Sequence, residues 1–144
     1  MTLYAFTKKN KVGIDLEYEN VAIDINSVIE LFFSDIEKAK VNKKKSSQKY
    51  RAFLEIWTQK EAFSKAHGKG LSSILEETFA PFIFIHSFVP EQNFIASLCI
   101  EGQARQINYF QILFPYLDFE IFLEKNAGSG LIQQLHPKIL QSRV

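Results

Sequence analysis

The feature that most constrains this chain is a helical segment between Ser47 and Ala66. Four large apolar side chains stand at positions i, i+3, i+4 and i+7 of this segment: Tyr50, Phe53, Leu54 and Trp57. This spacing places them on one face of an α-helix, and that face has to be buried against another element. Ser47 is the expected N-cap, and Gly68 and Gly70 are expected to end the helix. The chain therefore needs a second layer on which this helix can pack.

Strands on either side of the helix are expected to supply that layer. Residues Val12–Tyr18 alternate with period two, which is typical of a strand. The polar turn Lys8–Lys11 predicts a hairpin between this strand and a first strand over Thr2–Thr7. Further strands are expected over Thr78–Val89, Phe94–Ile100 and Gln106–Phe114, and helices over Ile25–Phe33, after Ser34 and over Leu131–Leu140. This order predicts a single α+β domain in which an antiparallel sheet packs against the long helix.

Composition excludes several classes of protein. The 144 residues correspond to one domain, and a hydrophobic fraction of 47% excludes a wholly disordered chain. The formal net charge of +1 argues against binding nucleic acid through bulk charge. Cys99 is the single cysteine, and no membrane span or signal peptide is visible. We therefore expect a cytoplasmic protein without nucleic-acid or membrane partners.

A basic segment, Lys38–Arg51, contains seven of the 17 basic residues and no acidic residue. Its centre, Asn42–Ser47, is polar and is expected to be a loop. One interpretation is a solvated loop that keeps the protein soluble. The other is a surface that meets an anionic ligand or an acidic partner.

Carboxylates near the helix are the strongest candidates for chemistry. Asp15 and Glu17 lie two positions apart on one strand, so their side chains point to the same side, about 7 Å apart. Alone, this pair could be the solvent-facing edge of a strand. Continuing the helical stripe beyond Trp57 gives Glu61 and then Lys65, which could be an i,i+4 surface pair. If Glu61 instead faces the strand, three carboxylates would form a site suited to Mg²⁺.

Two lysines would stand near such a site. Lys65 follows Glu61 by four positions, and Lys69 lies between Gly68 and Gly70. A metal ion with lysines is what phosphoryl transfer requires, because negative charge on the phosphate oxygens has to be neutralised. Zinc ligands at the usual spacing and a glycine-rich phosphate loop are both missing from the sequence. Glu37, taken alone, is expected to be a charge on a helix surface.

Four segments together resemble the 4′-phosphopantetheinyl transferase superfamily. They are Val12-Gly13-Ile14-Asp15-Leu16-Glu17, Phe33-Ser34 with Glu37, Trp57-Thr58-Gln59-Lys60-Glu61-Ala62 with Lys65, and Gly68-Lys69-Gly70-Leu71. The resemblance extends from Leu3 to Ile100. It implies Mg²⁺-dependent transfer of the phosphopantetheine arm of coenzyme A to a serine of an acyl or peptidyl carrier protein, with release of 3′,5′-ADP. Such a holo-acyl-carrier-protein synthase activity serves fatty acid, polyketide or nonribosomal peptide biosynthesis.

The resemblance also implies roles for individual residues. Asp15, Glu17 and Glu61 would hold Mg²⁺, and Glu61 would accept the serine proton, directly or through a water. Lys65 would neutralise charge on the attacked phosphate, and Lys65 and Lys69 would bind coenzyme A. Because carrier proteins of this family are acidic, the Lys38–Arg51 segment becomes a candidate docking surface.

The chain is similar to the C-terminal lobe of the two-lobed, surfactin-synthase-activating type. Residues 1–111 are expected to form this lobe and residues 112–144 an extension of unknown role, while no counterpart of the first lobe is recognised. A homo-oligomer or a separate first-lobe partner would then complete the site. The alternative is a non-catalytic or truncated lobe that binds Mg²⁺–coenzyme A or a carrier protein without turnover.

Overall fold

The computed structural model describes residues 1–19, 24–70, 82–102, 106–113 and 118–124. Its elements follow in the order β1 (Thr2–Phe6), β2 (Val12–Tyr18), α1 (Ile25–Phe32), α2 (Asp35–Asn42), α3 (Ser46–His67), β3 (Ile83–Phe88), β4 (Phe94–Glu101), β5 (Ile107–Leu113) and β6 (Asp118–Glu124). The predicted α+β class, with an antiparallel sheet against a long helix, is confirmed. The helix expected over Leu131–Leu140 and the start of the strand expected from Thr78 lie outside the described residues.

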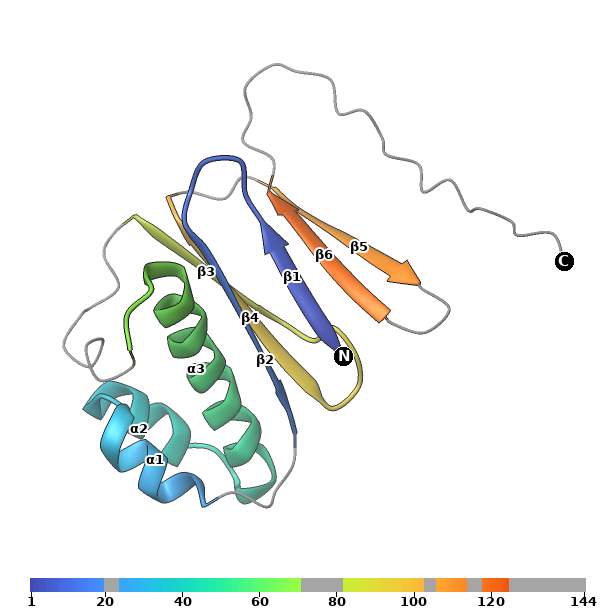
Figure 1. Cartoon of the computed structure of the whole chain (residues 1–144). Helices are drawn as coiled ribbons and strands as arrows, with labels where there is room; N and C mark the ends of the chain where they lie inside the picture. Colours follow the sequence, from blue (N-terminus) through green and yellow to red (C-terminus); the bar gives the residue numbers. More distant parts are fainter. Residues whose placement is uncertain (20–23, 71–81, 103–105, 114–117, 125–144) are drawn as a thin grey trace, which may run out of the picture.

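The central layer is a three-stranded antiparallel sheet in the order β2-β4-β3. Helix α3 lies across one face of this sheet, with α1 and α2 beside it (Figure 1). All six residues from Ile95 to Ile100 of β4 are buried. A middle strand covered on both faces has no side that needs to be polar, which explains why β4 shows little alternation.

A second sheet has the order β1-β6-β5 and lies on the side of the central sheet away from α3 (Figure 1). Strand β1 pairs in parallel with β6, from Thr2 opposite Phe119 to Phe6 opposite Leu123. The predicted β1–β2 hairpin is therefore wrong, because the turn carries the chain from one sheet to the other. Strand β6 was not predicted from the sequence. Strand β5 continues across the expected domain boundary at residue 111, and that boundary stays a prediction.

The helices begin and end largely where local sequence indicates. Ser34 is the N-cap of α2, and with Glu37 it forms a capping box, in which each side chain accepts from the other residue's backbone N–H. Gly68 ends α3 in the left-handed conformation, with φ of 64°. The N-cap of α3 is Lys45 rather than the predicted Ser47. The loop expected over Asn42–Ser47 is shorter, because α2 ends at Asn42 and α3 begins at Ser46.

The predicted stripe on α3 packs partly as expected. Tyr50, Phe53 and Leu54 are buried together with Ile29 of α1, Phe33 just after α1, and Val41 of α2. In the part of the chain that the structure describes, no helix has the length and apolar character needed to cross a membrane.

Candidate functional site

The C-terminal half of α3 approaches the central sheet through a row of small residues. Thr58, Ala62 and Ala66 lie four positions apart on one helix face, and all three are buried. Gly13 of β2 lies directly beneath them. A Cβ atom on Gly13 would be 2.0 Å from the Ala62 carbonyl oxygen and 2.4 Å from the Ala66 backbone nitrogen. The missing side chain of Gly13 therefore lets the helix backbone lie almost against the strand.

The neighbouring row of α3 contains Trp57, Glu61 and Lys65, each one position before a member of the small row. The Trp57 indole N–H donates to Glu17 Oε1 at 3.2 Å. Lys65 Nζ donates to Asp15 Oδ1 at 2.6 Å. The face of β2 that bears Asp15 and Glu17 therefore packs against α3. The alternative of a solvent-facing strand edge does not hold.

The electrostatics of this site show an excess of negative charge. Asp15 is only 6% exposed, and its Oδ2 atom is buried without a hydrogen-bond partner among the described residues. Burial, and then the charge of Asp15, raise the pKa of Glu17, and the Trp57 hydrogen bond and Lys65 oppose this only in part. Burial and Asp15 likewise raise the pKa of Glu61, which Lys65 lowers and Glu17 raises further. One ammonium group therefore faces three carboxylates.

This arrangement fits a bound cation chemically. A divalent cation would satisfy the unpartnered oxygen of Asp15. It would also offset the burial and the negative charge of Asp15, which together raise the pKa of Glu17 and of Glu61. A donor set made only of carboxylate oxygens favours Mg²⁺ over zinc or copper. Within the described ranges, however, no three His, Cys, Asp or Glu side chains are arranged to enclose a metal ion, and Lys65 contacts Asp15 directly. The role of the three carboxylates as metal ligands stays a prediction.

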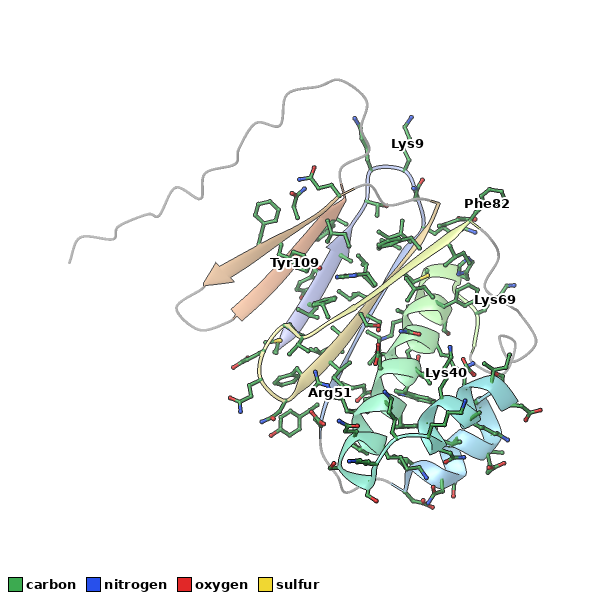
Figure 2. All side chains as sticks on the ribbon, turned by 180° about the vertical axis from the view of Figure 1, so that it is seen from behind. Lys9, Lys40, Arg51, Lys69, Phe82 and Tyr109 are labelled. Carbon is green, nitrogen blue, oxygen red and sulfur yellow. The ribbon has the colours of Figure 1, made fainter. Side chains whose placement is uncertain are left out.

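Lys69 lies just beyond the C-terminal end of α3 (Figure 2), four positions after Lys65 in the sequence. Its backbone N–H donates to the Ser64 carbonyl at 3.2 Å, and the Ser64 hydroxyl donates to the Lys69 carbonyl. The side chain of Lys69 is exposed. The structure places Lys69 at the same end of the helix as Lys65, and its contact with coenzyme A stays a prediction.

Glu37 forms an ion pair between α2 and α3 that the sequence did not predict. Its Oε2 atom pairs with Lys60 Nζ at 3.0 Å, and the two side chains are 16% and 9% exposed. Lys60 Nζ also lies 5.9 Å from the centre of the Phe33 ring. The expectation of a charge on a helix surface is therefore wrong, since Glu37 joins α2 to α3. The spacing from Ser34 to Glu37 was a readable signal of the capping box, but nothing in the sequence indicated the pairing with Lys60.

Known proteins with similar sequences point to one family. The model of the 4′-phosphopantetheinyl transferase superfamily matches residues 11–123. The 4′-phosphopantetheinyl transferase HetI of Nostoc sp. is 29% identical over 122 residues, covering 76% of this chain and 52% of that protein. A Synechocystis sp. protein, slr0495, whose name assigns it provisionally to the same activity, is 28% identical over 75 residues, covering 52% of this chain and 30% of that protein.

The chain thus spans about half the length of HetI and less than a third of slr0495. No solved structure matches it significantly. The family model covers strand β2, which bears Asp15 and Glu17, and helix α3, which bears Glu61. Because that match extends over most of the chain, the protein belongs to the 4′-phosphopantetheinyl transferase superfamily.

Proposed function

We propose that this protein transfers the phosphopantetheine arm of coenzyme A to a serine of an acyl or peptidyl carrier protein. The observation that carries the proposal is the buried Asp15, whose Oδ2 lacks a described partner. Burial, and then the charge of Asp15, raise the pKa of the neighbouring Glu17 and Glu61. Such an excess of negative charge is costly unless a cation is bound. Membership of the superfamily gives the reaction class for which that cation would be used.

Asp15, Glu17 and Glu61 would hold Mg²⁺, which supplies charge neutralisation for the pyrophosphate of coenzyme A. The serine oxygen forms a bond to the phosphorus that bears the pantetheine arm, and the bond from that phosphorus to 3′,5′-ADP breaks. Glu61 accepts the serine proton, directly or through a water.

Lys65 would neutralise charge on the phosphate that is attacked. Its side chain is 52% exposed, so it can leave Asp15 and turn to a ligand without unfolding the helix. Lys69, just beyond the end of the same helix, would add a second positive charge for coenzyme A. Both lysines lie at the C-terminal end of α3, where an extended anionic ligand could contact first one and then the other.

The basic segment supports an acidic carrier protein as the partner. The basic residues at its ends are neutralised within the chain, because Lys38 pairs with Glu30 and Arg51 pairs with Glu19. The lysines between them form no ion pair with any described residue: Lys40, Lys43, Lys44, Lys45 and Lys49. This cluster of unpaired positive charge on α2, the following turn and the start of α3 suits electrostatic capture of an acidic surface.

Because the chain spans about half of HetI, a second candidate is binding of Mg²⁺–coenzyme A or carrier protein without turnover. A second copy of the chain, or a separate first lobe of the surfactin-synthase-activating type, would then be needed to complete the site. The proposed location of this reaction is the cytoplasm.

Intact-protein mass spectrometry tests the proposal. An apo carrier protein is incubated with the chain, coenzyme A and Mg²⁺, beside an EDTA sample and a Glu61→Gln variant. A Glu55→Gln variant is the matched control, because Glu55 is exposed on the same helix. We expect a mass gain of one phosphopantetheine arm that EDTA and Glu61→Gln abolish and Glu55→Gln preserves. No gain from a folded chain would reject turnover by the chain alone and favour the binding candidate.

A further inference from the structure

A chain of buried polar side chains connects α3 to the middle of the central sheet. The Thr58 and Ser97 hydroxyls lie 2.7 Å apart, and the Ser97 and Ser87 hydroxyls 2.9 Å apart. Gln59 Nε2 donates to the Ser87 hydroxyl at 2.9 Å, and the Thr58 hydroxyl donates to the Glu55 carbonyl at 3.1 Å. We call the four side chains Thr58, Gln59, Ser87 and Ser97 the hydroxyl chain.

The hydroxyl chain has a consistent direction of hydrogen bonding. Gln59 donates to Ser87, Ser87 to Ser97, Ser97 to Thr58, and Thr58 to the backbone carbonyl. Each of the three hydroxyls then donates once and accepts once. Thr58 and Ser97 are both 0% exposed. Apolar side chains of the same shape would fill such a position at little or no cost in stability, so stability alone does not account for the hydroxyls.

The position of the hydroxyl chain relates it to the carboxylate site. Asp15, Ser97 and Ser87 are direct cross-strand partners on β2, β4 and β3, so their side chains lie in one row on the face that α3 covers. Thr58 follows Trp57 directly and lies three positions before Glu61. The Thr58–Ser97 hydrogen bond therefore joins the strand beside Asp15 to the helix that bears Glu61.

The small residues at the contact between α3 and β2 do not fix how the helix is rotated on the strand or where it lies along its axis. Gly13, Ala62 and Ala66 allow close approach of α3 and β2. Contacts between such small groups are van der Waals contacts, which are not directional. A hydrogen bond is directional and weakens steeply when its atoms are displaced. From this we infer that the hydroxyl chain is a positioning device, which fixes the rotation and axial position of α3 so that Glu61 and Lys65 stand opposite Asp15.

Two substitutions of Thr58 separate positioning from packing. Thr58→Val keeps the shape of the side chain and removes the hydroxyl, whereas Thr58→Ser keeps the hydroxyl and removes a methyl group. The inference rests on the proposed function for its kinetic arm. There we expect Thr58→Val to lower kcat about tenfold while KM for coenzyme A changes less than about twofold, since misplaced catalytic groups reduce turnover more than binding. Thr58→Ser should recover most of the lost kcat.

A second measurement does not depend on activity. Trp57 is the single tryptophan, and its indole N–H donates to Glu17, so its proton resonance reports the register of α3 on β2. In metal-free protein, we expect Thr58→Val to shift this resonance and speed its exchange with solvent, whereas Thr58→Ser leaves both close to the wild type. If the wild-type chain proves inactive, the proposed function fails, but this measurement still decides the positioning role.

A stability control completes the design. Val41 is fully buried on α2, away from the hydroxyl chain, and Val41→Ala should destabilise the fold without changing kcat well below its melting temperature. Two results would overturn the inference. One is a Thr58→Val variant with wild-type kcat and an unchanged Trp57 resonance. The other is a set of variants in which kcat and the resonance follow thermal stability alone, with Val41→Ala affected as strongly as Thr58→Val.

Discussion

At the scale of single residues, Gly13 determines how closely α3 and β2 can pack. Gly13→Ala would place a Cβ atom 2.0 Å from a backbone oxygen of the helix, and backbone atoms cannot move aside as a flexible side chain can. We expect this variant to lose about 3 kcal/mol or more of the free energy of unfolding, measured by urea denaturation.

Gly68→Ala is the matched control for Gly13→Ala. Gly68 has a φ of 64°, but a Cβ atom there would meet nothing within 4 Å. The expected loss is about 1 kcal/mol, which is the cost of a left-handed conformation for alanine. A Gly13→Ala variant no less stable than Gly68→Ala would contradict the close approach of helix and strand.

The acidic side chains of the site should cost stability in the absence of a metal ion. The folded protein raises the pKa of Glu61 above its ordinary value of 4.5, so folding favours the protonated carboxyl group. The free energy of unfolding is therefore undiminished below pH 4.5, and it falls as the pH rises through the raised pKa and Glu61 ionises. Glu61→Gln cannot ionise and avoids this loss. We expect it to melt about 1–3 °C above the wild type at pH 7 in EDTA, with the difference vanishing below pH 4.5. Excess Mg²⁺ should stabilise only the wild type. A lower melting temperature for Glu61→Gln than for the wild type at pH 7 would contradict a cost of ionising Glu61 in the folded protein.

At the scale of secondary-structure elements, the Glu37–Lys60 ion pair holds α2 against α3. Glu37→Gln preserves a side-chain oxygen for the capping box but leaves Lys60 buried without its counter-charge. We expect a loss of about 3 kcal/mol in the free energy of unfolding, because an unpaired buried charge is costly. The double variant Glu37→Gln/Lys60→Met should recover part of this loss. A double variant as unstable as the sum of the two single variants would show that the charges do not interact.

Sequence patterns predicted the elements better than the contacts between them. The helical stripe, the strand alternation of β2 and the caps at Ser34 and Gly68 depend on neighbouring residues, so they could be read directly. The pairing of β1 with β6 joins segments more than 110 positions apart, and no local pattern specifies such a partner. The helical periodicity of α3 also predicted part of the site, because it places Glu61 and Lys65 on the same helix face as Trp57. The hydroxyl chain and the Lys60 pairing were missed because polar residues on a helix are ordinarily read as exposed.

At the scale of the whole molecule, the distribution of charge matters more than its sum. A net charge of +1 suggests no electrostatic partner. The lysines of the turn between α2 and α3 are nevertheless exposed, and they form no ion pair with a described residue. Reversing Lys43 and Lys44 to glutamate should raise KM for an acidic carrier protein about tenfold and leave kcat nearly unchanged, because docking is affected and chemistry is not.

The matched control for this charge reversal is Lys8→Glu/Lys9→Glu, which makes the same change in net charge on the turn between β1 and β2 (Figure 2). Lys9 lies at the other end of the molecule from the start of α3, so this control should leave KM close to the wild-type value. Raising the salt concentration should weaken the wild-type interaction and shrink the difference between the two double variants. Salt screens exposed charges from one another, and at 0.1 M their interaction is largely lost beyond about 10 Å. Equal effects of the two double variants would mean that net charge, not the basic surface, governs capture of the carrier protein.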